Sequence, residues 1–149
     1  MKNKLFLPVL IFIALTLAGL IVQFQLQIQG KKVITMGKAK ITVEIADTTE
    51  KKVKGLSGRP SLGQNEGMLF VFPQKSAYSF WMKDMKFPLD FIWINGSQVV
   101  DITKNVPYPQ DSGQPPLVSP KAVVDKVLEV NAGVADSSGI QIGDTIVGF

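Results

Sequence analysis

The stretch from Gly67 to Ile94 constrains the fold most, because it concentrates large apolar side chains in three short runs. The runs read GMLFVF, YSFWM and FIWI, and segments rich in turn-forming residues separate them. Short runs that are rich in aromatic and β-branched residues are typical of strands, whereas helices need longer segments. We therefore expect this stretch to form the centre of one small, mainly β domain.

Strand signals also occur on both sides of this centre. KITVEIA, residues 40–46, alternates apolar and polar side chains, which indicates a strand with one buried face. FIWI and SQVV flank Asn95-Gly96, the preferred residue pair for a two-residue type I′ hairpin turn. AVVDKVLEV, residues 122–130, carries apolar side chains at both alternating sets of positions, so we expect a central strand.

The elements together predict the fold class. We count about seven strands, joined mostly by short turns, and two short helices at residues 48–56 and 132–138. Asp47 and Glu50 have the spacing of a helix capping box at the first of these helices. Such a series favours antiparallel pairing, and we expect a compact antiparallel β-barrel or sandwich of the α+β class.

A long proline-rich segment interrupts this series. Residues 105–120 read NVPYPQDSGQPPLVSP, with five prolines and no periodicity. Loops of this length inside a compact domain are often functional. The alternative is a surface loop that Tyr108 and Leu117 hold against the domain.

The N-terminus predicts a separate segment. Leu5 to Val22 is 18 residues without a charge, and as a helix it would span about 27 Å, close to the thickness of a bilayer core. We expect residues 1–22 to form a transmembrane anchor, residues 23–38 a linker, and residues 39–149 a single β-rich domain. A signal peptide that is cleaved is the alternative, although no small-x-small site follows the apolar run. The alternating stretch at 23–29 suits either a strand or a frayed helix end.

Charge favours a location outside the cytoplasm and argues against nucleic acid. The net charge of +4 comes from the first 40 residues, since the chain from Ile41 onward has 10 basic and 12 acidic residues. A nucleic-acid-binding protein carries its basic surface on the folded domain, so we expect no nucleic-acid partner. Lys2 and Lys4 favour a cytoplasmic N-terminus, with the membrane contacted through residues 5–22; secretion after cleavage is the alternative.

Composition excludes several kinds of chemistry. The chain has no cysteine and no histidine, which rules out thiol nucleophiles, Ser-His-Asp sites and the commonest zinc ligands. Phosphate-binding and dinucleotide-binding glycine motifs are also missing from the sequence. We expect no cofactor and no metal.

Five residues are candidates for a binding site: Arg59, Trp81, Lys83, Asp90 and Tyr108. Trp81 and Lys83 fall on one face of the same predicted strand and could frame a pocket for a planar or sugar-like ligand. The alternative puts Trp81 in the core and Lys83 in solvent. Asp90 follows Pro-Leu, where it either accepts backbone N–H groups or points into the pocket.

Acidic residues suggest two further roles, a structural ion pair and a catalytic acid–base pair. Glu129 lies in an apolar strand and needs a partner if it is buried, so we expect a structural ion pair with Arg59. Glu66 and Asp90 together could serve as the acid and base of a hydrolase that acts on saccharide or cell-envelope material. We favour a small-ligand or envelope-component binding or structural module over this enzyme.

A series of motifs supports the same fold: GLSGRPSL, EGMLFVFP, SFWMKDMKFPLDFIWI, VLEV-x-AG and GI-x-IGD-x-I. In this order they resemble the bacterial and archaeal family called domain of unknown function 192, over residues 41–149. The resemblance implies a compact, mainly β domain and brings no established activity. Its pattern falls on Gly55, Leu56, Arg59, Leu62, residues 67–72, 80–83, 88–90 and 128–130, Gly133, Gly139, Gly143 and Asp144.

The chain departs from the family pattern at two places. Ser57 stands where the family usually has methionine, and Asp84-Met85 stands where it usually has Asn-Thr. We expect no activity here that depends on the amide of that asparagine.

Overall fold

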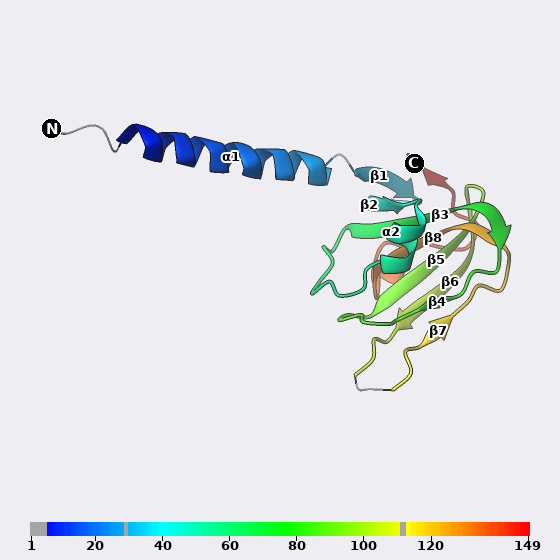
Figure 1. Ribbon diagram of the computed structural model, residues 1–149. Coiled ribbons are helices and arrows are strands. Elements are labelled where there is room, and N and C mark those ends of the chain that lie inside the picture. The colour runs from blue at the N-terminus through cyan, green and yellow to red at the C-terminus, as the bar shows by residue number, and fades with distance from the viewer. Residues whose placement is uncertain (1–5, 29, 111–112) are drawn as a thin grey trace. The chain divides into compact units, whose positions relative to one another are not determined.

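The computed structural model describes residues 6–28, 30–110 and 113–149, and the chain divides after Lys31 into two units. The first unit holds one helix, and the second, Lys32–Phe149, is the β domain (Figure 1). The elements are α1 (Phe6–Ile28), β1 (Lys31–Met36), β2 (Ala39–Ala46), α2 (Thr49–Lys54), β3 (Glu66–Ser76), β4 (Phe80–Trp81), β5 (Leu89–Asn95), β6 (Gln98–Val106), β7 (Leu117–Val118), β8 (Val124–Asn131), α3 (Val134–Ser137) and β9 (Ile146–Val147).

The prediction of an N-terminal transmembrane helix at residues 1–22 is wrong. The apolar run is helical in α1, but no helix in the described part of the chain is long and apolar enough to cross a bilayer. The helix continues past Val22 to Ile28, so the alternation there marks a helix end and not a strand.

The predicted linker, residues 23–38, contains a strand of the β domain. β1 pairs antiparallel with β9, at Thr35 with Val147 and Met36 with Ile146. Ile34 and Met36 are fully buried. Burial of alternate side chains stabilises a strand here, and the basic residues around it masked this signal in the sequence.

The mainly β prediction is confirmed. Seven strands form one sheet in the order β6-β5-β8-β3-β2-β1-β9, which curls into a half-barrel (Figure 1). The chain bridges the two edges of this sheet, because the Ile146 amide donates to the Ser97 carbonyl and Gln98 pairs with Thr145. β8 is central, as expected, and lies between β3 and β5.

One strand pair departs from the antiparallel expectation. β2 and β3 run parallel, with Val43 beside Gly67 and Ile45 beside Leu69. Parallel neighbours need a crossover connection, and the chain supplies it between residues 47 and 65, which include α2. This crossover brings α2 over one face of the sheet, where Figure 1 shows it in front of β3 and β8.

The core lies on both faces of the sheet. Side chains alternate along each central strand, so Leu69, Ile92 and Leu128 join one apolar cluster while Phe70 and Phe91 join another on the opposite face. Trp93 belongs to the second cluster and is fully buried, with its indole N–H donating to the Thr103 hydroxyl. The second cluster lies under α2, β4 and β7.

β4 differs from the predicted central strand. It is two residues long and pairs with β7 in a separate small sheet, Phe80 opposite Val118 and Trp81 opposite Leu117. β5 already has β6 and β8 as neighbours, so neither of its edges is free for β4. The YSFWM run therefore covers the second apolar cluster instead of extending the sheet.

The predicted β5–β6 hairpin is confirmed, but its turn is shifted by one residue. Asn95 pairs with Gln98, so the two turn residues are Gly96 and Ser97. Gly96 has a φ of 64°, and Ser97 is not among the residues with positive φ. A type I′ turn on Asn95-Gly96 needs positive φ at both residues, whereas glycine at the first turn position alone fits type II′.

Two buried aspartates anchor the proline-rich segment at its ends. Asp90 accepts the backbone N–H of Asn105 (2.8 Å) and also that of Ala135 (2.9 Å). Asp101 accepts the backbone N–H of Lys121 (3.0 Å). Of the two residues named for the surface-loop alternative, Tyr108 packs against the second apolar cluster, whereas Leu117 is 68% exposed and does not hold the loop.

Replacing Asp90 with alanine should destabilise the domain strongly. The substitution leaves two backbone N–H groups without their acceptor, and each buried unsatisfied donor costs about 1–3 kcal/mol, so we expect a loss of about 2–6 kcal/mol. Urea unfolding measures it. The control is Asp136→Ala, which removes a surface ion pair with Lys104 and should cost at most about 1 kcal/mol. Equal losses for the two variants would contradict the role of Asp90.

Candidate functional site

The crossover helix α2 forms the roof of the candidate site. Its N-cap is Thr48, whose hydroxyl accepts the Lys51 amide; Asp47, the predicted cap, forms an ion pair with Lys51 instead. Gly55 ends the helix with a φ of 49°, and a side chain added there would start 3.3 Å from the Phe70 ring. Only glycine combines this backbone conformation with so close an approach, which holds the end of α2 against Phe70.

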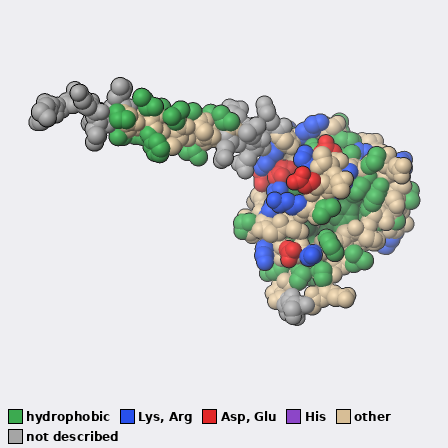
Figure 2. Space-filling view, in the orientation of Figure 1, with side chains coloured by type: hydrophobic (Ala, Val, Ile, Leu, Met, Phe, Trp, Pro, Cys, Tyr) green, Lys and Arg blue, Asp and Glu red, His purple; other side chains and the backbone are tan. Residues whose placement is uncertain are grey.

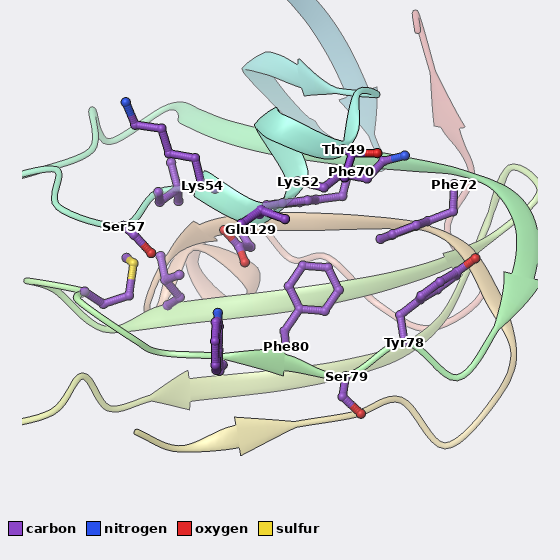
Figure 3. A pocket seen from close by; sticks show the side chains of 16 residues that line it. Thr49, Lys52, Lys54, Ser57, Phe70, Phe72, Tyr78, Ser79, Phe80 and Glu129 are labelled. Atoms are coloured by element: carbon purple, nitrogen blue, oxygen red, sulfur yellow. The ribbon is translucent and has the colours of Figure 1, made fainter. Parts of the chain in front are cut away.

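A pocket of about 310 Å³ lies between α2, β3, β4 and β8. Its size falls at the lower end of the range for small-molecule sites. Figure 3 shows the Glu129 carboxyl between Ser57 and Phe80, with Phe72 and Tyr78 at the other end of the pocket. The lining residues are Thr49, residues 52–57, Phe70, Phe72, residues 78–81, Met85, Leu89 and Glu129.

Aromatic rings form much of the wall, and their mutual packing holds them in place. Phe72 and Tyr78 stack with ring centroids 3.7 Å apart, and the Tyr78 hydroxyl donates to the Gln74 carbonyl. Phe80 meets Phe70 edge to face at 5.0 Å. Phe80 also contacts the buried Trp93, so the pocket wall is continuous with the core. Side chains fixed in this way lose little further freedom when a ligand enters.

Glu129 is the acid of this pocket. It lies on β8, opposite Met68 of β3 and Phe91 of β5, and is 5% exposed. Burial raises the pKa of Glu129 to about 8, although the positive charge of Arg59 opposes the shift. The carboxyl is therefore mostly protonated at neutral pH and offers one O–H donor and one acceptor.

Arg59 forms its ion pair with Glu44, not with Glu129 as predicted. Its two terminal nitrogens each lie 2.7 Å from a different Glu44 carboxylate oxygen. Hydrogen bonding to Glu44 raises the pKa of Arg59. The Glu44 and Arg59 side chains are each about one-third exposed, so this pair costs less desolvation than a pair with the buried Glu129. On the α2 face, Figure 2 shows charged groups gathered beside exposed apolar ones.

The structure brings together two of the five predicted site residues. Lys83 lies over the Trp81 ring, 5.3 Å from its centroid. Trp81 is 54% exposed, so its assignment to the core is wrong. Both residues border a second, open pocket of about 660 Å³ that Leu117 and the proline-rich segment also line.

Three predicted site residues lie outside both of these pockets. The fully buried Asp90 is occupied by backbone N–H groups, and Tyr108 packs on the second apolar cluster. Arg59 lines neither pocket and acts on Glu129 only through its charge. The proposed acid and base, Asp90 and Glu66, do not converge, because Asp90 is turned to the backbone and a Glu66 oxygen accepts the Gly63 amide.

Sequence reasoning missed Phe70, Phe72, Tyr78 and Lys52 as pocket residues. The alternation of GMLFVF places Phe70 and Phe72 on one face of β3, a signal that was present in the sequence. Nothing in the sequence placed α2 above that face, since the position of a crossover depends on which strands pair.

Replacing Glu129 with glutamine should remove a pH dependence of stability. With a folded pKa of about 8, the folded state keeps a proton that the unfolded chain loses at the ordinary value of 4.5. The stability of the wild type should therefore fall relative to Glu129→Gln as the pH rises through this window. We expect the wild type and Glu129→Gln to have similar free energies of unfolding near pH 4.5. Near pH 8 the free energy of unfolding of the wild type should be lower by about 1–4 kcal/mol relative to the variant. Urea unfolding across this range measures the difference, and a constant difference would contradict a protonated Glu129.

A double-mutant cycle should separate the two partners considered for Arg59. The coupling between Arg59→Ala and Glu44→Ala should be about 1 kcal/mol, since the pair is bidentate but partly exposed. The coupling between Arg59→Ala and Glu129→Gln should be smaller. Free energies of unfolding measured near pH 7 give both coupling energies. A larger coupling of Arg59 with Glu129 than with Glu44 would support the predicted Arg59–Glu129 pair instead.

Comparison with solved structures shows the same fold elsewhere. A Sinorhizobium meliloti 1021 protein, described as a candidate transcription regulator, matches with a TM-score of 0.70 and 29% identity over 79% of this chain and 93% of that chain. A protein of unknown function from Novosphingobium aromaticivorans DSM 12444 matches with a TM-score of 0.67 and 30% identity over 78% of this chain and 83% of that chain.

Sequence comparison gives the family. A search of curated proteins returned no match. The sequence profile of DUF192, described as uncharacterized ACR, matches residues 32–148. This range includes all of β1 except its first residue, although the motif series began only at residue 41. The chain therefore belongs to the DUF192 family.

Proposed function

We propose that the β domain binds a small molecule with a flat apolar ring in the pocket between α2 and β4. The observation that carries this proposal is the composition of the pocket wall. Five aromatic side chains, those of Phe70, Phe72, Tyr78, Phe80 and Trp81, surround a space that one buried carboxyl also borders. Apolar pockets with a few convergent polar groups and a perturbed acid are typical of binding sites.

The aromatic side chains and Glu129 contribute to ligand binding in different ways. Rings in offset or edge-to-face contact contribute about 0.5–1.5 kcal/mol each beyond the burial of their area. The protonated Glu129 adds one directional hydrogen bond that orients the ligand. Among the described residues, none donates a hydrogen bond or forms an ion pair with this carboxyl, so its polar atoms are available to a ligand.

A carboxylate-based hydrolase has less support. Glycoside hydrolysis uses two carboxyl groups on either side of the scissile bond. Glu129 is the only acid among the described lining residues, and Asp90 and Glu66 are engaged elsewhere. The raised pKa of Glu129 suits a general acid, but the pocket lacks a second carboxylate to complete the pair.

The description of the S. meliloti protein as a regulator gives no support to DNA binding here. In the β domain, α2 has six residues and α3 has four, too short for a recognition helix. The charge from Ile41 onward is also slightly negative, at 10 basic against 12 acidic residues.

The location of the domain outside the cytoplasm stays a prediction.

Ligands that carry a naphthalene ring test the proposal. We expect 2-naphthylmethanol or a charged relative to bind the domain with micromolar to millimolar affinity, measured by isothermal calorimetry. Trp81→Ala should weaken binding about three- to tenfold, because one aromatic contact of about 0.5–1.5 kcal/mol is lost.

Leu117→Ala is the matched control. Leu117 pairs directly opposite Trp81 and is also apolar and mostly exposed, but it does not line the pocket. This variant should bind as the wild type does. Failure of every naphthalene probe to bind, or an equal loss in both variants, would refute the proposed site.

A further inference from the structure

We infer that the pocket selects a ring compound that carries a negative charge, of the aromatic carboxylate class. The inference rests on the proposed function and extends it from the shape of the ligand to its charge. Three features carry it: the charges around the pocket, the positions of two lysines on its aromatic rings, and the surroundings of Glu129.

The charged groups of the pocket are cationic at neutral pH. Lys52 and Lys54 on α2 line it, and Lys83, which does not line it, lies over the ring of Trp81. Glu129 is the single acid of the described lining, and it is mostly protonated. An anion that enters therefore meets the Lys52 ammonium and a neutral carboxyl, whereas a cation meets like charge at Lys52.

Two lysines already occupy positions that a ligand cation would need. The Lys52 ammonium lies 5.0 Å from the Phe72 ring centroid, and the Lys83 ammonium lies 5.3 Å from the Trp81 centroid. Aromatic faces attract cations, so an ammonium ligand would have to displace these groups or remain beside them. A carboxylate on a ring seated in the pocket would instead find the Lys52 ammonium at the end of its flexible side chain.

The neighbours of Glu129 determine how this preference depends on pH. Arg59 faces it from the loop after α2, and Glu44 of β2 and Glu66 of β3 lie near that guanidinium. Asp90 of β5 is held by backbone N–H groups, and Lys52 and Lys54 lie above on α2. Glu129 is thus the lining group that changes charge near pH 8, and its ionisation would repel a carboxylate.

Three probes with one ring separate charge from shape: 2-naphthoate, 2-naphthylmethanol and 2-naphthylmethylamine. At pH 7, calorimetry should rank them in this order, with 2-naphthoate bound about tenfold or more tightly than the amine. Lys52→Gln should weaken 2-naphthoate about three- to tenfold and leave 2-naphthylmethanol unchanged. Lys51→Gln is the matched control, because Lys51 lies on the same helix, pairs with Asp47 and does not line the pocket.

A pH series gives an independent readout. From pH 7 to about pH 9, 2-naphthoate should lose affinity in the wild type and keep it in Glu129→Gln, while 2-naphthylmethanol should change little in either. Equal affinities for the three probes, or tightest binding of the amine, would overturn the charge preference and leave the proposed pocket standing. Loss of binding by all three would refute the pocket itself.

Discussion

The parallel pairing of β2 with β3 is the constraint on which the site depends. Two neighbouring strands that run in the same direction cannot be joined by a hairpin, so the chain must cross one face of the sheet. The crossover places α2 over Phe70 and leaves a space beside it that β4 closes from the other side. An antiparallel arrangement of these strands would remove the helix, the roof and the pocket together.

The buried acids divide into two kinds, and the division points to function. Asp90 and Asp101 each accept backbone N–H groups from distant segments, so their burial is offset by hydrogen bonds that anchor the proline-rich loop. Glu129 has no such donor among the described residues, and it avoids the cost of a buried charge by keeping its proton. A hydrophobic residue would suit the same position better for stability alone, which favours a role toward a ligand.

The sequence predicted the elements better than their connections. Alternation identified β2, β5, β6 and β8 because each buries one or both faces, and the same signal places Phe70 beside Phe72. It did not predict that the YSFWM run would leave the main sheet, since that depends on β5 already having two neighbours. The ion-pair partner of Arg59 could not be predicted from the sequence either. Glu44 lies 15 residues away on a strand whose register no local pattern reveals. The uncharged apolar run at residues 5–22 predicted a helix that spans a membrane. In the described part of the chain, no helix is long and apolar enough to do so.

Titration of the Glu129 carboxyl carbon by ¹³C NMR in the folded domain, assigned with the Glu129→Gln variant, tests most directly whether this acid is protonated. We expect the resonance to keep the chemical shift of a protonated acid through neutral pH and to change with a midpoint near 8. A midpoint near the ordinary glutamate value of 4.5 would show an ionised carboxylate at neutral pH. That result would contradict both the neutral donor in the pocket and the preference for an anionic ligand.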